Sequence, residues 1–181
     1  PIKIDPVVSN NEGKVVVEAF TKSNKDIVIE IYDADNNLIK TAKNKEEIVI
    51  NNPHLWNGKK DPYLYVAKAK LIDNDKVIDE VSHQFGFRTF TYDSKKGFFL
   101  NGVSYPLRGV SRHQDRLLKG NAISKEDQEE DMNLILDIGA NTVRLAHYQH
   151  DDYFLDLCDK YGLVIWAEVP YISKHMPNAK D

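Results

Sequence analysis

Residues 141–166 contain a strand, an amphipathic helix and a second strand in close succession, and this stretch constrains the fold most. The run TVRL at 142–145 is typical of a short strand, and Phe154, Leu157, Cys158 and Tyr161 have the spacing that forms one face of a helix. Gly162 is typical of a helix end, and the apolar run LVIW at 163–166 predicts a strand covered on both faces. The stretch is therefore predicted to be a βαβ unit with parallel strands.

The residues before this unit extend the same pattern. A short strand is predicted at 107–110, SKED at 124–127 resembles a capping box, and the helix that follows is predicted to end at Gly139. The pattern β-α-β-α-β fits the opening part of a (β/α)₈ TIM barrel, which takes about 250 residues when complete. RGVSRHQD lacks the G-x-G-x-x-G of a dinucleotide-binding sheet, which disfavours that fold. An incomplete barrel exposes two sheet edges, so self-association is a hypothesis.

The first half of the chain has a different pattern, with short alternating runs separated by turn residues. Strands are predicted at residues 2–8, 14–20, 27–32, 38–42, 46–50, 63–72 and 76–87. Seven strands at this spacing predict an immunoglobulin-like β-sandwich over residues 1–92, followed by the incomplete barrel domain over 93–181. His54 and His83 stand apart in the sequence, and we expect structural roles for both.

Two features are predicted near the boundary between these halves. The polar run at 91–96 (TYDSKK) is predicted to be a linker, because the apolar pattern lapses there. Asn101-Gly102 lies between two apolar runs, which predicts a hairpin with a type I′ turn.

Composition excludes several classes of function. The formal net charge of −4 and the lack of a Lys/Arg run argue against nucleic-acid binding. No apolar run approaches the roughly 20 residues that cross a bilayer, so no membrane association is expected. The single cysteine, Cys158, is expected to be a packed thiol, and a cytoplasmic location is predicted. The absence of an initial methionine suggests that the chain is part of a longer protein.

Polar residues follow each predicted barrel strand. Arg112 and His113 end the first strand, Arg144 and His147 the second, and Glu168 the third. The carboxyl ends of barrel strands form the rim that carries active sites in this fold. Arg144 would be costly inside a barrel unless a carboxylate paired with it, and Glu168 is a candidate partner. Plain loop histidines and a structural ion pair remain alternatives at this stage.

Several motifs in fixed order carry a resemblance to a known family. They are FGFR at 85–88, FLNG at 99–102, LRGVSRHQD at 107–115, N-x-V-R-x-x-H-Y at 141–148 and D-x-x-G-L-V-I-W at 159–166. In this order they resemble glycoside hydrolase family 2, and RGVSRHQDR is most similar to the β-galactosidases within it. The chain departs from the family pattern at Leu145-Ala146, where small residues are usual, and at Gln149, where proline is usual.

The resemblance implies a retaining β-galactosidase that hydrolyses terminal β-galactosides with two glutamates on later barrel strands. Those strands would lie beyond residue 181, so the chain alone is expected to be inactive. The resemblance also implies that His113 and His147 contact sugar hydroxyls and that Arg144 lies beside the nucleophilic carboxylate, with Arg112 and Glu168 at the same rim. The remaining domains of the same longer chain are expected partners, and a homo-oligomer is a further hypothesis.

No cofactor and no metal site is predicted. Some relatives bind magnesium through a Glu and a His shortly after the third strand, but here the corresponding position is Ile172, and His175 is out of step. Two alternatives for function stay open: a non-catalytic carbohydrate-binding or interaction module, and a family enzyme of other specificity, a β-glucuronidase or a β-mannosidase.

Overall fold

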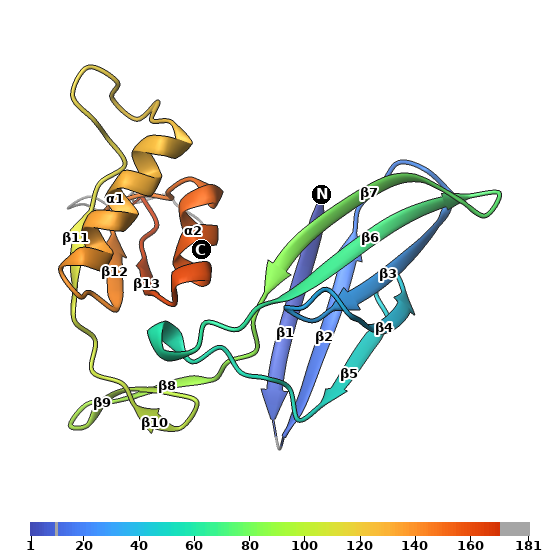
Figure 1. Cartoon of the computed structure of the whole chain (residues 1–181), viewed down its shortest axis with the longest axis horizontal. Coiled ribbons are helices and arrows are strands. Elements are labelled where there is room, and N and C mark those ends of the chain that lie inside the picture. Colours follow the sequence, from blue (N-terminus) through green and yellow to red (C-terminus); the bar gives the residue numbers. More distant parts are fainter. Residues whose placement is uncertain (10, 171–181) are drawn as a thin grey trace, which may run out of the picture. The chain divides into compact units, whose positions relative to one another are not determined.

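The computed structural model describes residues 1–9 and 11–170, which fall into two compact units that meet between Tyr105 and Pro106 (Figure 1). The predicted positions Ile172 and His175 lie outside the described residues. No helix in the described part of the chain is both long and apolar enough to cross a bilayer.

The first unit is built on two antiparallel sheets. One has the order β1-β2-β5 and the other the order β4-β3-β6-β7. Their strands are β1 (Ile2–Ser9), β2 (Glu12–Ala19), β3 (Asp26–Tyr32), β4 (Leu38–Lys43), β5 (Glu47–Asn51), β6 (Tyr65–Asp73) and β7 (Lys76–Phe85), with a 3₁₀ turn η1 (Gly58–Lys60) before β6. All seven lie at the predicted places, so the predicted immunoglobulin-like sandwich is confirmed.

The sandwich is held together by inward-facing side chains of both sheets. Alternate residues of each strand point inward, as in Val15 and Val17 of β2 and Ile29 and Ile31 of β3, all at most 1% exposed. The rings of Tyr65, Phe85 and Phe87 pack against one another with centroids 5.4–5.6 Å apart. No charged side chain belongs to this described core, which suits a structural role.

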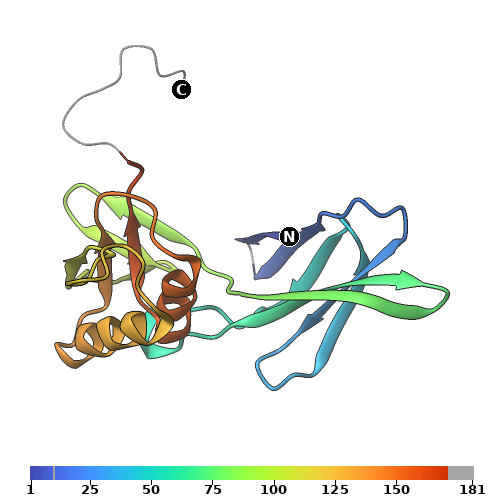
Figure 2. The same ribbon diagram turned by 90° about the horizontal axis from the view of Figure 1, so that it is seen from above.

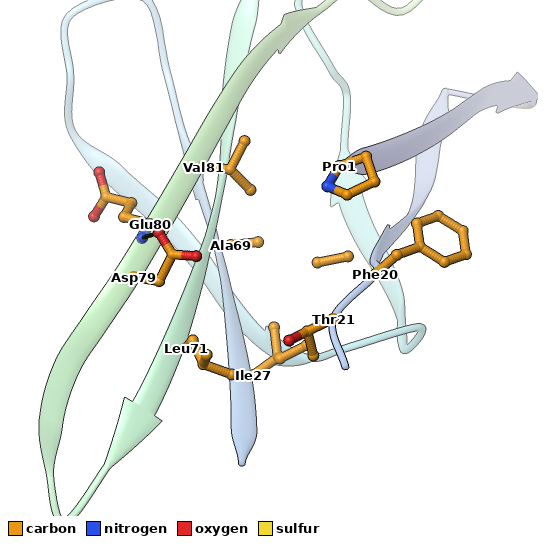
Figure 3. A pocket seen from close by; sticks show the side chains of 10 residues that line it. Pro1, Phe20, Thr21, Ile27, Ala69, Leu71, Asp79, Glu80 and Val81 are labelled. Atoms are coloured by element: carbon orange, nitrogen blue, oxygen red, sulfur yellow. Dashed lines mark hydrogen bonds between the residues drawn. The ribbon is translucent and has the colours of Figure 1, made fainter. Parts of the chain in front are cut away.

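A pocket of about 100 Å³ opens at one end of the sandwich (Figure 3). The side chains of Phe20, Ala69, Leu71 and Val81 are among those that line it. Glu80 lies on the opposite side of β7 from Val81, as the alternation of a strand requires. Thr21, Asp79 and Glu80 are also among the lining residues, so the lining mixes aliphatic and polar groups.

A small antiparallel sheet follows the sandwich within the first unit, and it corrects the prediction of a linker. It consists of β8 (Phe90–Asp93), β9 (Gly97–Leu100) and β10 (Val103–Ser104), so half of the predicted linker at 91–96 is strand. Every residue of β8 is exposed, so its sequence carries no burial pattern, and pairing with β9 defines the strand. The predicted type I′ turn is confirmed, because Asn101 and Gly102 have φ values of 50° and 77°.

The second unit contains a parallel sheet covered by two helices (Figures 1 and 2). Its elements are β11 (Gly109–Arg112), α1 (Lys125–Asp137), β12 (Thr142–Leu145), α2 (Asp152–Tyr161) and β13 (Val164–Ala167). The strands pair in the order β11-β12-β13, all parallel, which confirms the predicted start of a TIM barrel. Gly162 ends α2 with a left-handed φ of 75°, as predicted.

The two faces of this sheet differ. Val143 and Leu145 of β12 face the helices and join a core with Met132 of α1 and Phe154 of α2. The opposite face carries Ser111, Arg144 and Trp166, which are register neighbours across the three strands. Trp166 is 65% exposed, so the prediction that residues 163–166 are covered on both faces is wrong for this chain.

The predicted capping box at the start of α1 is confirmed, and Asp127 makes it sensitive to pH. Its carboxylate accepts hydrogen bonds from Ser124 N at 2.8 Å and Lys119 Nζ at 2.6 Å. These bonds, with that from Lys119 the stronger, lower the pKa of Asp127 from 3.8 to about 2. Because the folded pKa lies below the unfolded one, the carboxylate stabilises the fold above about pH 4, and this contribution is lost as the pH falls towards 2.

We therefore expect Asp127→Asn to lower the free energy of unfolding near neutral pH and to approach the wild type as the pH falls from about 4 to about 2. Urea denaturation of both proteins over this range measures the difference. Comparing the two proteins cancels the titration of the other carboxyl groups. A difference that stays constant with pH would contradict the assignment.

Candidate active site

The predicted rim residues come from the carboxyl ends of all three parallel strands. His113 directly follows β11, Arg144 lies on β12, and Glu168 directly follows β13. His147 follows β12 in the loop that leads to α2. Since parallel strands end at the same edge of a sheet, these side chains meet there.

Arg144, His147 and Glu168 form a triangle of contacts. Arg144 Nε donates to Glu168 Oε1 at 2.6 Å, and His147 Nδ1 lies 3.0 Å from Glu168 Oε2. Arg144 Nη2 lies 3.3 Å from His147 Nδ1. The expected ion pair between Arg144 and Glu168 is present, and the Arg144 side chain is 43% exposed in the described part of the chain.

These contacts favour the ionised form of Glu168. The hydrogen bond from Arg144 lowers the pKa of this carboxyl below its ordinary value, His147 adds to the effect, and partial burial opposes it. Glu168 is thus an ionised acceptor at neutral pH. We assign the Nδ1 proton of His147 to the contact with Glu168, because that contact is the shorter one and a carboxylate only accepts. In the neutral ring, Nε2 is then able to accept a hydrogen bond from a hydroxyl group.

Aromatic and imidazole rings gather beside this triangle. The ring centroids of His113 and His147 lie 5.1 Å apart, and those of His113 and Tyr148 lie 6.4 Å apart. The Tyr148 hydroxyl accepts a hydrogen bond from Gln114 N at 3.0 Å. A hollow of about 340 Å³ near the rim is lined by residues that include Leu145, Tyr148 and Glu168. The rim thus combines polar tips with flat ring surfaces, which are the groups that line small-molecule sites.

Arg112 lies elsewhere than predicted. Its side chain is on the helix-covered face of the sheet and only 6% of the residue is exposed. Nε donates to Asp131 Oδ2 at 2.9 Å, and the guanidinium carbon lies 3.8 Å from the ring centroid of Phe154. A buried side chain engaged in this way does not present its charge at the rim. Of the five predicted site residues, Arg112 is therefore the one that the structure separates from the others.

Sequence reasoning missed two residues that the structure brings next to Arg112. His150 is 4% exposed and Asp131, on α1, carries the partner carboxylate. One signal was present for Arg112. In a strand, successive side chains point to opposite faces of the sheet, so Arg112 lies on the same face as apolar Val110 and opposite to Ser111. This alternation predicts that Arg112 faces the helices. Nothing in the local sequence marks His150 as buried.

His54 of the first unit forms a separate local cluster. Its Nε2 lies 2.6 Å from Asp61 Oδ2, and its ring stacks on Tyr63 with centroids 3.9 Å apart. Across residues 1–9 and 11–170, no group of three or more His, Cys, Asp or Glu side chains is placed to hold a metal ion.

Two family models match the chain. The model described as glycosyl hydrolases family 2 matches residues 2–88, and the model described as the TIM barrel domain of glycosyl hydrolases family 2 matches residues 93–181. The two matches meet between residues 88 and 93, whereas the compact units of the structure meet at Tyr105 and Pro106. The domain boundary at residue 92 stays a prediction.

Individual relatives carry two different names. A β-glucuronidase of Bacteroides fragilis is 46% identical over 70% of this chain, and a β-galactosidase of Thermoanaerobacter pseudethanolicus is 30% identical over 93% of it. The crystal structure of an FMN-binding β-glucuronidase from Facaelibacterium prausnitzii L2-6 matches 93% of the chain with a TM-score of 0.86 and 36% identity. The chain spans only 18%, 23% and 28% of the lengths of these three proteins.

Proposed function

Because this chain belongs to glycosyl hydrolase family 2, we propose that it forms the immunoglobulin-like domain and the first barrel strands of a retaining β-glycosidase. The observation that carries the proposal is the triangle of Arg144, His147 and Glu168 at the carboxyl edge of the sheet. This is the edge where a barrel enzyme binds its substrate.

The proposed reaction needs two carboxyl groups about 5 Å apart, one to protonate the leaving oxygen and one to attack the anomeric carbon. The family resemblance assigns both to glutamates on later strands. In this proposal, His113 and His147 form hydrogen bonds with sugar hydroxyls. These bonds become stronger in the transition state, in which positive charge develops on the sugar. Arg144 presents its guanidinium to the nucleophilic carboxylate and keeps it ionised. Glu168 holds Arg144 and His147 in place.

A terminal β-galactoside is our first candidate substrate, on the basis of the motif RGVSRHQDR at 108–116. The charges at the described rim are consistent with it. Recognition of a glucuronide requires a cation for the sugar carboxylate, and the two predicted rim arginines, Arg112 and Arg144, are already paired with Asp131 and Glu168. A neutral galactoside makes no such demand.

A β-glucuronide is the second candidate, because the Bacteroides fragilis relative with 46% identity is named a β-glucuronidase. In that case the cation for the sugar carboxylate would come from other parts of the longer protein. A non-catalytic carbohydrate-binding module is an alternative of a different class.

Hydrolysis of 4-nitrophenyl β-galactoside and β-glucuronide by the complete protein separates these candidates. The proposal predicts that kcat/KM for the galactoside exceeds that for the glucuronide by at least about 100-fold, the scale of discrimination that a mismatched polar group produces. The opposite ratio would establish the second candidate. Sugar binding without turnover of either substrate, or of 4-nitrophenyl β-mannoside, would support the module and overturn the enzyme. The 181-residue chain alone is expected to show no turnover.

The partners proposed for this chain follow from the same account. They are a β-galactoside and the remaining domains of its own protein, with a homo-oligomer as a further proposal. β13 and β11 are the outer strands of the described parallel sheet, so in the 181-residue chain alone either edge is open to pairing with a second copy, whereas later strands would cover both edges in a complete barrel. A cytoplasmic location is also proposed, since Cys158 is a buried free thiol.

A further inference from the structure

Arg112 and His150 form the buried part of a connection from α1 to the peptide that precedes His147. Arg112 Nε donates to Asp131 Oδ2 and Arg112 Nη1 donates to His150 Nδ1, both at 2.9 Å. His150 Nε2 in turn lies 3.0 Å from the carbonyl oxygen of Ala146. The connection therefore runs from a helix on the covered face of the sheet to the residue next to His147.

The chemistry of the partners fixes the protons of this connection. A guanidinium only donates, so His150 Nδ1 accepts from Arg112 and its proton resides on Nε2, which donates to the Ala146 carbonyl. His150 is thus a neutral imidazole with both ring nitrogens engaged. Burial lowers its pKa, in agreement with this state. Rotation of the ring would break both bonds, so the ring has one stable orientation.

Further contacts hold both ends of the connection. Arg116 Nη2 donates to the second carboxylate oxygen of Asp131 at 2.9 Å, and Ala146 N donates to the Arg112 carbonyl at 3.0 Å. Ala146 is therefore tied to Arg112 twice, by a direct backbone bond and through the His150 ring. This double tie leaves the peptide before His147 little freedom to move.

We propose that His150 is a positioning residue for the rim, and that with Arg112 and Asp131 it holds the Ala146 carbonyl so that His147 meets Arg144 and Glu168. Its effect on catalysis rests on the glycosidase function proposed above. Side chains that contact a substrate work only when a supporting layer of hydrogen bonds fixes them, and a displacement of about 1 Å lowers rates about 100-fold. Arg112 thus supports the rim indirectly, because it holds His150 on the helix-covered face of the sheet.

Three substitutions at one position test this role in the complete protein. His150→Phe keeps a flat ring and removes both hydrogen bonds, whereas the amide of His150→Gln can place an N–H group near the position of Nε2 and that of His150→Asn can place an acceptor oxygen near the position of Nδ1. We expect His150→Phe to lower kcat by about 30- to 100-fold with less than about a threefold change in KM. His150→Gln is expected to recover to within about tenfold of the wild type, because the bond to Ala146 is the one that reaches His147.

The matched control is Leu157→Ala, which opens a cavity in the core beside α2 without touching the connection. It is expected to lower the melting temperature while kcat, measured well below that temperature, stays within about twofold of the wild type. An equal loss of kcat in Leu157→Ala and His150→Phe would overturn the proposal, since general loosening would then explain both.

Amide hydrogen exchange gives a readout that does not depend on turnover. His150→Phe is expected to accelerate exchange at the Ala146 amide at least about tenfold, and Leu157→Ala is not. If the wild-type protein hydrolyses neither substrate, the proposed function fails, and exchange still decides whether His150 holds this peptide. Unchanged exchange in His150→Phe, or unchanged kcat in an active enzyme, would overturn the inference.

Discussion

Replacing Arg144 with methionine is expected to lower kcat/KM of the complete enzyme by about 100- to 1,000-fold, the usual cost of removing one preorganised group that stabilises transition-state charge. Methionine keeps much of the length and apolar volume of the side chain. It removes the guanidinium that donates to Glu168 at 2.6 Å and lies beside His147. Steady-state kinetics with both 4-nitrophenyl glycosides measures the loss.

Two further variants define the cause of this effect. Arg144→Lys keeps the charge but not the planar fork of donors, so its activity is expected to lie between the wild type and Arg144→Met. Lys40→Met removes one positive charge from an exposed position of β4 in the first unit, and no change beyond about twofold is expected. Wild-type kinetics in Arg144→Met would show that Arg144 has no part in the reaction.

Asp131→Ala is expected to lower the free energy of unfolding of the second unit by about 3 kcal/mol, because it leaves the Arg112 cation buried without its carboxylate. The Arg112 side chain is 5% exposed and lies 2.9 Å from this carboxylate. Urea denaturation followed by far-ultraviolet circular dichroism reports on the unit, since both α-helices of the described chain belong to it.

Glu130→Ala is a matched control from the adjacent residue of α1. Glu130 also pairs with an arginine, Arg116, at 2.6 Å, but its side chain is 62% exposed. A solvent-exposed pair contributes about 0–1 kcal/mol, so this variant is expected to remain close to the wild type. If the two substitutions lowered the free energy of unfolding equally, burial of the Arg112–Asp131 ion pair would not explain the effect of Asp131→Ala.

The sequence was sufficient to predict the fold where local patterns and tertiary structure agree. Turn residues separate the strands of the sandwich, and the capping box of α1 and Gly162 define helix ends. Strand β8 was missed because all four of its residues are exposed and its identity depends on pairing with β9. The apolar run at 163–166 predicts that Trp166 is covered, but the residue is 65% exposed. Apolar composition alone does not show which face of a strand packs against another element.

The sequence predicts those site residues that lie at the carboxyl ends of the parallel strands. Arg144, His147 and Glu168 converge because the carboxyl ends of parallel strands meet at one edge. Arg112 ends the same kind of strand, but its side chain alternates to the covered face. His150 and Asp131 become its partners only through the packing of α1 and the loop before α2 against that face. Contacts of this kind depend on tertiary structure, and no local spacing indicates them.

A crystal structure of the complete protein with bound galactose or glucuronate is the most direct test of a sugar site at this rim. The account predicts a sugar at the carboxyl edge of β11, β12 and β13, with a hydroxyl within about 3.2 Å of a ring nitrogen of His147. It also predicts that the Arg144–Glu168 ion pair is retained. A sugar bound away from this edge, with His147 and Arg144 not in contact with it or with a catalytic carboxylate, would contradict the account.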